Sequence, residues 1–355
     1  MIENRIKQIE IDIGEDVAED NRNAVIKTVK ALGDGHNLNG SGRKKLWKLL
    51  KDKNPKVSNA VPVGKKDESG KLVTAHSELQ ELYLKTYTHR MRNRPMKTEL
   101  EYLKEYKEKL FNIRLKLSKK KISKPWTIKD LENALKSLKN DKARDPNDWC
   151  NEIFRNEVAG KSLKISLLGF LNKMKDQKII PEFVRLANIS TIYKGKGSKA
   201  ELINDRGIFI VTIIRSILMR LIYSDYYQKI DNSMSDSQVG SRKGKNIRNH
   251  IWIINGIITD VLSSKSKIPV DVKIYDYKQC FDGLWLQECL NDFYEAGLRD
   301  DKFALLYDVN RSVNIVVKTP LGITTRNSIY NVITQGDVIT LYFAVNRLIS
   351  LVKNA

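Results

Sequence analysis

The chain has 355 residues, 41% of them hydrophobic, which is enough for two or three domains and a sizeable buried core. This composition excludes a purely disordered protein. Lys and Arg number 63 against 42 Asp and Glu, a formal net charge of +21. Residues 251–355 hold 11 basic and 11 acidic side chains, so the whole excess lies in residues 1–250. A basic excess of this size favours a polyanionic partner, with nucleic acid as the first candidate and an anionic membrane as the second.

Cysteine usage and hydropathy indicate the compartment. The three cysteines show no CxxC spacing and no nearby histidine cluster, so they predict neither a disulfide framework nor a zinc site: Cys150, Cys280 and Cys289. The N-terminal residues lack the apolar run of a signal peptide, and the most apolar segment, residues 207–223, is interrupted by two arginines. We therefore expect an intracellular protein, in the nucleus or the cytoplasm and not secreted, with no membrane partner.

The first half of the chain reads as basic and helical. Residues 77–117 predict a helix-rich arm, and residues 81–130 hold 15 basic against 6 acidic side chains. A solvated helix face explains such a run as well as a binding surface does. Thr127 and Asp130 have the spacing of a capping box and open a further helix.

The rest of the chain is predicted to contain both helices and strands. The pattern predicts a strand that runs directly into a cationic loop tip, four cations in seven residues ahead of a long apolar helix, a second strand with period two, and a β-hairpin between two helices. In chain order these are a helix at 163–174, the strand at 184–193 with its loop at 194–199, a helix at 213–230, the cations of 242–248, the apolar helix at 250–262, the strand at 270–276, a helix ending near Gly297, the hairpin from 313 and a last helix at 338–352.

The strand at 270–276 carries a carboxylate where an apolar side chain is expected. Its period of two puts Asp276 on the same face as Val270, Val272 and Ile274. An ordinary strand-end aspartate remains the alternative when the IYD tripeptide is taken alone.

Five segments, taken together and in order, resemble the reverse transcriptase domain of LINE-type, non-LTR retrotransposons. They are KSLKNDKARDPNDWCNEIF at 136–154, STIYKGKGSKAELINDRGI at 190–208, QVGSRKGKNIRNH at 238–250, IYDYKQCFD at 274–282 and NVITQGDV at 331–338. The resemblance implies an α+β fold of the right-hand polymerase type. It places a helix-rich basic N-terminal extension at 1–120, a fingers-type region at 121–262 and a partial palm at 263–355.

The resemblance also implies an RNA-directed DNA polymerase, whose partners are an RNA template, a DNA primer and deoxynucleotide triphosphates. It implies that Asp276 is the first catalytic, metal-bridging carboxylate, with the backbone carbonyl of Tyr277 as a second ligand. The cofactor would be Mg²⁺ or Mn²⁺, because hard cations take oxygen ligands and lower the barrier to in-line attack on a phosphate.

Further residues take nucleotide-binding roles by the same resemblance. Lys194 and Arg206 match the positions that hold the triphosphate, and Phe281 matches the one that excludes ribonucleotides at the sugar 2′ position. Gln335 and Gly336 match the turn that packs against the nascent base pair. Solvated surface cations and a core aromatic remain the alternatives for the first three.

Five cations of the loops are candidates for contact with the nucleic-acid backbone. They are Lys196, Arg242, Lys243, Lys245 and Arg248. Each stands in a Gly-containing cationic stretch, a composition that suits phosphate contact.

The second acidic block of the family, an aromatic-x-Asp-Asp turn, does not occur in this sequence. The Asp-Asp pair at Asp300 and Asp301 follows a helix-ending glycine and precedes a helical segment. Because a lone carboxylate cannot place two metal ions, we expect little or no polymerase activity from this chain by itself. A non-catalytic nucleic-acid-binding remnant is the main alternative, and a fragment that does not fold stably is the third.

Overall fold

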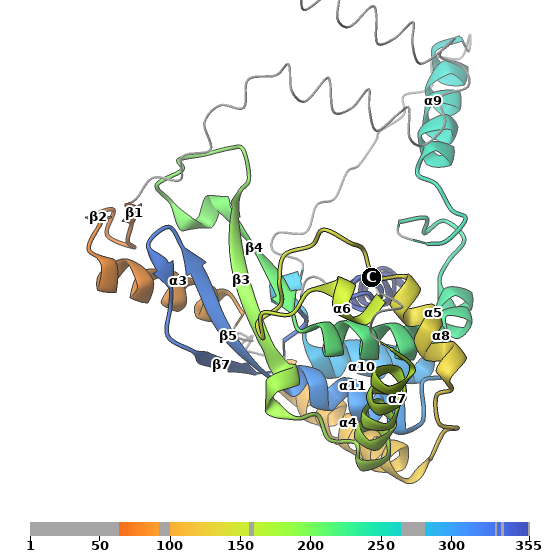
Figure 1. The fold of residues 1–355 in the computed structure, drawn as a ribbon. Coiled ribbons are helices and arrows are strands. Elements are labelled where there is room, and N and C mark those ends of the chain that lie inside the picture. The colour runs from red at the N-terminus through yellow and green to blue at the C-terminus, as the bar shows by residue number, and fades with distance from the viewer. Residues whose placement is uncertain are drawn as a thin grey trace, which may run out of the picture. The chain divides into compact units, whose positions relative to one another are not determined.

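The computed structural model describes residues 64–91, 100–155, 160–240, 242–263, 281–330, 332–334 and 337–353. These residues form a mixed α+β structure in which helices predominate (Figure 1). The helices are α3 (His76–Arg90), α4 (Leu100–Lys120), α5 (Ile128–Lys136), α6 (Asn151–Arg155), α7 (Gly160–Gln177), α8 (Ile213–Ser233), α9 (Arg248–Ser263), α10 (Leu286–Glu295), α11 (Asp301–Arg311) and α12 (Thr340–Lys353). The strands are β1 (Lys65–Lys66), β2 (Leu72–Val73), β3 (Leu186–Tyr193), β4 (Asp205–Val211), β5 (Ser312–Thr319), β6 (Gly322–Ile323) and β7 (Asn327–Tyr330), and short 3₁₀ turns lie at Glu182–Arg185, Leu202–Asn204 and Phe281–Gly283.

The main sheet joins strands from two distant parts of the chain. Its order is β4-β3-β5-β6, and β7 also pairs with β5. β3 and β4 form an antiparallel hairpin, whereas β3 and β5 run parallel, with Ala187 opposite Ile315. The expected strand at 184–193 is present, although its first two residues belong to the 3₁₀ turn, and the hairpin expected from residue 313 is β5 with β6.

One face of this sheet is covered by α3. Tyr83 and Tyr87 of α3 are buried in a cluster with inward-facing residues of β3, β4 and β5. The approach is close at Gly207, where a Cβ atom would stand 2.6 Å from the Tyr87 ring. A glycine at this point of β4 therefore lets the helix lie against the strand.

The larger core is helical. Side chains from α4, α5, α7, α8, α10, α11 and α12 share one buried cluster, and Figure 1 shows several of these helices gathered beside the lower end of the sheet. Within it, α5 begins with the predicted capping box. The Thr127 side chain accepts from the Asp130 amide, while the Asp130 carboxylate accepts from the Thr127 amide at 2.8 Å.

A fully buried arginine ties α8 to the segment before α12. Arg215 donates through Nε to Asp337 at 2.9 Å, through Nη1 to the Val309 carbonyl at 3.0 Å, and through Nη2 to Asn310 and Thr334 at 2.7 Å each. Thr334 in turn donates to Asp337 at 2.7 Å. The Arg215 guanidinium thus binds Thr334 and Asp337. These two residues flank Gln335 and Gly336, which lie outside the described part of the chain.

Candidate nucleic-acid interface

The β3–β4 hairpin carries the cationic loop predicted from the sequence. Seven residue pairs join the strands, from Ala187 opposite Val211 to Tyr193 opposite Asp205. The loop is closed by the Lys194 amide on the Asn204 carbonyl at 2.8 Å. Gly197 has φ +81°, and a Cβ there would meet the Asn204 side chain at 2.5 Å. The loop therefore has a defined shape that depends on glycine.

A buried ion pair anchors the base of this loop. Lys65 donates to Asp205 at 2.7 Å, and both side chains are almost fully buried. The same ammonium donates to the Lys199 carbonyl at 2.7 Å, and the Lys66 amide donates to the Ala200 carbonyl. Sequence reasoning missed Lys65, because nothing in its local pattern distinguishes it from the many solvated lysines around it.

The hairpin brings together three predicted site residues. Lys194 follows the last residue of β3 and donates through Nζ to the Ile203 carbonyl at 2.7 Å. Lys196 is exposed in the loop. Arg206 is exposed on β4, directly opposite Ile192 of β3. Three of the cations expected to meet phosphate thus belong to one hairpin, and the Lys194 side chain is bonded within its own loop.

The face of the sheet opposite α3 is only partly covered. The register aligns one row of side chains across four strands on this face: Ile208, Ser190, Lys318 and Ile323. Ile192, Ile208 and Ile323 are 52%, 40% and 60% exposed, and Lys318 is exposed as well. Arg206 and Lys318 lie on this face two strands apart, about 12 Å from each other by ordinary strand spacing. Sequence reasoning missed Lys318, because its place depends on the parallel pairing of β3 with β5.

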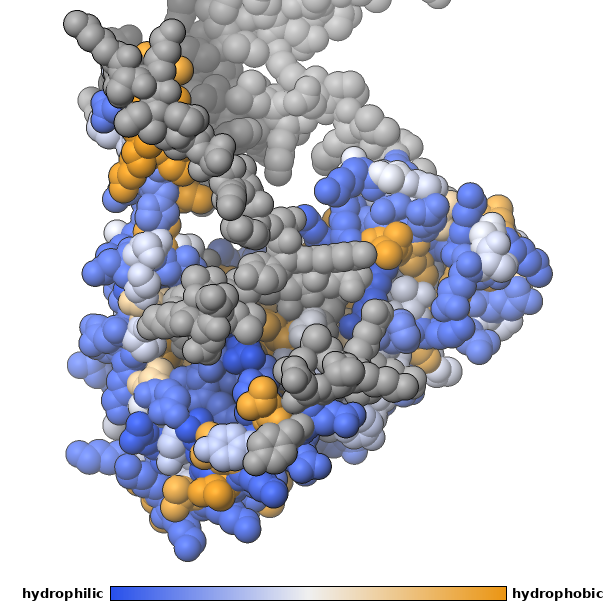
Figure 2. All heavy atoms as spheres, turned by 180° about the vertical axis from the view of Figure 1, so that it is seen from behind, coloured by the Kyte–Doolittle hydropathy of each residue, from blue (hydrophilic) through white to orange (hydrophobic). Residues whose placement is uncertain are grey.

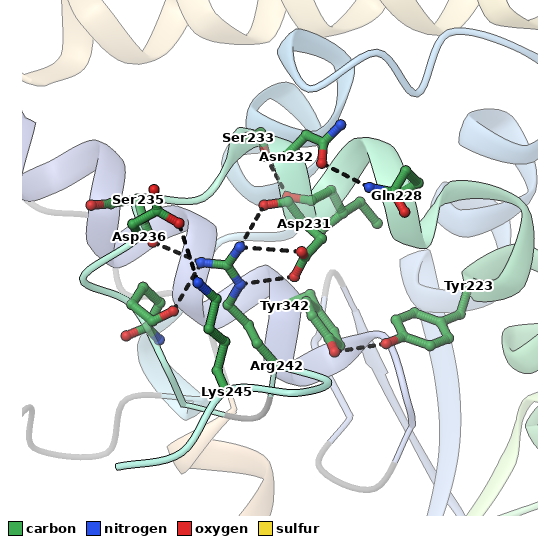
Figure 3. A network of polar contacts seen from close by, with 12 residues as sticks. Tyr223, Gln228, Asp231, Asn232, Ser233, Ser235, Asp236, Arg242, Lys245 and Tyr342 are labelled. Atoms are coloured by element: carbon green, nitrogen blue, oxygen red, sulfur yellow. Dashed lines mark hydrogen bonds and ion pairs between the residues drawn. The ribbon is translucent and has the colours of Figure 1, made fainter. Parts of the chain in front are cut away.

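Arg242 differs from the expectation that it contacts nucleic acid. Its side chain is buried and donates to both carboxylate oxygens of Asp231, at 2.8 and 3.2 Å, and to the carbonyls of Asp231, Ser235 and Gln238 (Figure 3). The hydrogen bonds and charge of Arg242 lower the pKa of the Asp231 carboxyl. The guanidinium therefore fixes the turn after α8, and a burial of this kind cannot be read from a local basic pattern.

The neighbouring cations are more accessible. Lys243 is exposed, and Arg248 is the exposed first residue of α9. Lys245 stands 3.3 Å from the Asp236 carboxylate, and Figure 3 labels both residues. These three remain candidates for phosphate contact.

The predicted catalytic residues are only partly described. Phe281 is half-buried in the 3₁₀ turn ahead of α10. Asp276, Tyr277, Gln335 and Gly336 lie outside the described residues, as does the predicted strand at 270–276. Among the residues that are described, no three His, Cys, Asp or Glu side chains gather in a group that could hold a metal ion. The Mg²⁺ or Mn²⁺ site therefore stays a prediction.

Helix α9 exposes its apolar surface. No side chain of its described length is buried, and Trp252 and Leu262 are 82% and 81% exposed. Figure 2 shows orange, hydrophobic surface in the region of this helix, at the upper left of the view. In the part of the chain that is described, no helix is long and apolar enough to cross a bilayer.

Comparison with known proteins adds no relative. Neither the scan against protein-family models nor the search of curated proteins finds a match to this chain.

Proposed function

We propose that this chain is a nucleic-acid-binding domain of the reverse transcriptase type, in which the β3–β4 hairpin and the open sheet face contact an RNA template paired with a DNA primer. The observation that carries the proposal is the open face itself, where Arg206 and Lys318 stand among exposed isoleucines beside a lysine-bearing loop. The order of the five sequence blocks supports the same reading.

The chemistry of that face suits a nucleic-acid backbone. Guanidinium and ammonium groups bind phosphate oxygens, and each contact releases condensed counterions. Exposed apolar side chains between the cations can cover sugars and base edges without a hydrogen-bonding requirement. Because strand register fixes the spacing of Arg206 and Lys318, the surface is preorganised and loses little conformational entropy on binding.

The catalytic part of the proposal concerns residues 274–282 and 331–338. Asp276 and the Tyr277 carbonyl would hold Mg²⁺ or Mn²⁺, ions that stabilise the attacking and leaving oxygens when a nucleotide is joined to a primer. Lys194 and Arg206 would bind the triphosphate of the incoming nucleotide, with Phe281 against its sugar. Since the 355 residues contain no aromatic-x-Asp-Asp turn, we propose that this chain alone extends primers poorly.

Binding is tested first. Fluorescence anisotropy with a labelled RNA–DNA duplex should give an affinity that falls steeply with salt. Arg206→Gln and Lys318→Gln should each weaken it and reduce the slope of log K against log salt by about 0.9. Lys173→Gln, an exposed lysine of α7, is the matched control and should change neither value beyond the effect of net charge. A slope that stays the same in both sheet variants would refute the proposed surface.

Catalysis is tested by primer extension on a poly(A) template with Mg²⁺ and, separately, Mn²⁺. We expect incorporation near background for both the parent chain and Asp276→Asn. Robust incorporation that Asp276→Asn abolishes would overturn the expected inactivity while supporting the assigned catalytic aspartate. Duplex binding without any incorporation agrees with this proposal and equally with the second candidate, a non-catalytic binding module, which the missing acidic block specifically supports.

A further inference from the structure

A groove of about 270 Å³ lies between α5 and α8, on other elements than the β3–β4 hairpin. Each helix contributes one face to it, since the lining residues of both follow the i, i+3, i+4, i+7 spacing of a helical stripe. They are Asp130, Asn133 and Ala134 of α5 with its C-cap Ser137, and Arg220, Tyr223, Ser224 and Tyr227 of α8, joined by Lys243 from the segment before α9.

Arg220 is a half-buried cation without an ion-pair partner. Its Nε donates to the Ser137 hydroxyl at 2.7 Å and its Nη1 to the Ser216 carbonyl at 3.2 Å. No carboxylate of the described residues lies within ion-pair distance of it. Burial lowers the pKa of Arg220 and the charge of Asp337, beyond ion-pair distance, partly opposes that shift; the arginine remains charged at neutral pH.

Five other poorly exposed arginines of the described residues pair with a carboxylate: Arg114 with Glu295, Arg185 with Asp308, Arg215 with Asp337, Arg242 with Asp231 and Arg347 with Glu288. Half-buried Arg90 is satisfied in another way, by the Asp205 and Leu202 carbonyls and the ring of Tyr87, and it does not line the groove. Taking a charge partly out of water without an opposite charge is costly. An anionic group bound in the groove would supply the partner that Arg220 lacks.

Tyrosine rings form another part of the wall. Tyr223 and Tyr227 have ring centroids 5.4 Å apart at 59°, and the Tyr223 hydroxyl is bonded to that of Tyr342 at 2.7 Å. Because the Tyr223 hydroxyl is engaged by Tyr342, the carbon face and edge of the Tyr223 ring are what a ligand meets. Aromatic walls of this kind favour a planar ring.

The two ends of the groove differ in charge. Ser137, bonded to Arg220, and Asp130 are seven residues apart on α5, about 10 Å along the helix axis. Hydrogen bonds from the Thr127 amide and hydroxyl lower the pKa of Asp130, so its carboxylate is ionised at neutral pH. A phosphate is therefore attracted to the Arg220 end and repelled from the Asp130 end, where hydrogen-bond acceptors suit the amino group of a base.

We propose that this groove binds a single nucleotide, with its phosphate on Arg220 and Lys243 and its base against Tyr223 and Tyr227. The inference rests on the proposed function in taking that nucleotide from an unpaired RNA or DNA strand. A free nucleoside monophosphate offers the same chemistry and is the alternative source. The site is separate from the open sheet face, so the two can be tested independently.

The test compares three probes on the full chain: a single-stranded oligo(A) RNA, a blunt RNA–DNA duplex and AMP. Lys243→Gln and Arg220→Gln should each weaken single-strand binding roughly ten-fold, as expected for loss of a charged hydrogen bond. Duplex affinity should fall far less, while Arg206→Gln should show the opposite preference. Lys173→Gln serves again as the charge-matched control. Because Lys243 is exposed and Arg220 also braces Ser137, the Lys243 variant keeps the test valid if Arg220→Gln folds poorly.

The outcomes separate the two proposals. Competition of the oligo(A) by millimolar AMP assigns the groove to a free nucleotide, and its absence assigns the groove to a strand. Unchanged single-strand binding in Lys243→Gln, with intact folding, refutes the groove while leaving the sheet face standing. Equal losses of affinity for the duplex and for the single strand also refute it, because the groove would then be part of the duplex-binding surface. Loss of duplex binding only in Arg206→Gln supports the sheet face whatever the groove does.

Discussion

Replacement of Arg215 by methionine tests the internal support of the fold most directly. The guanidinium is completely buried, and its hydrogen bonds reach Asp337, Asn310, Thr334 and the Val309 carbonyl. Methionine has similar length but no charge and no donor. The substitution therefore leaves the Asp337 carboxylate buried with Thr334 as its hydrogen-bond donor among the described residues.

The magnitude follows from that uncompensated charge. Removing one partner of a buried ion pair costs about 3–5 kcal/mol, and each further buried acceptor left unpaired adds to the penalty. Whole domains are stable by only about 5–15 kcal/mol, so we expect Arg215→Met to approach the limit of folding. Asp337→Leu should cost a similar amount, because it leaves the arginine charge unpaired instead.

Urea unfolding followed by circular dichroism and by tryptophan fluorescence measures these changes. The double variant Arg215→Met with Asp337→Leu should be clearly more stable than the sum of the single losses, since it removes both charges together. A loss below about 1 kcal/mol for Arg215→Met, or strict additivity in the double variant, would refute the reasoning that the pair is buried and mutually dependent.

Three further changes probe other parts of the structure. Lys65→Met should destabilise the chain by about 3–5 kcal/mol, because it leaves the Asp205 carboxylate buried and unpaired. Amide hydrogen exchange should then increase first in the loop at 194–204. Unchanged protection of that loop would contradict the anchoring role of Lys65. Thr127→Ala should lower the free energy of unfolding by about 1 kcal/mol through loss of the α5 cap, whereas Thr127→Ser should cost much less. Burial raises the pKa of Asp292 from its usual 3.8 to about 6, so the folded state binds this proton more tightly than the unfolded state and the contribution of Asp292 to stability falls as pH rises from about 4 to about 6. The difference in the free energy of unfolding between Asp292→Asn and the parent should therefore change over that interval, and a difference that stays constant with pH would disprove the assignment.

Local chemistry explains why much of the secondary structure is predictable from the sequence. The capping box at Thr127 and Asp130 is a contact between residues three apart, so the sequence alone contains both partners. The glycine at position 297 adopts φ +101° just after α10, as a helix-ending glycine does. Strand β3 is similarly visible through its β-branched residues. In each case the interaction that determines the local structure joins residues that are close together in the sequence.

Local sequence patterns do not reveal interactions between residues that are far apart in the chain. The position of Lys318 on the open face depends on the parallel register of β3 and β5, which joins residues more than a hundred positions apart. Lys65 and Asp205 are separated by 140 positions. No periodicity or motif reports such pairs, because each partner alone resembles an ordinary surface charge.

The same reasoning decides which cations are available to a polyanion. Arg242 and Lys243 are adjacent in the sequence, yet Arg242 donates its hydrogen bonds to Asp231 and nearby carbonyls, while Lys243 is exposed. The net charge therefore overestimates the number of cations that can contact phosphate, because a buried arginine that is paired with a carboxylate is not available for such contact. Removing an exposed cation such as Lys243 should change the salt dependence of single-strand binding, whereas removing Arg242 should first lower the free energy of unfolding. A variant series that ranks these two residues the other way would show that the basic segment, and not its folded environment, determines contact with nucleic acid.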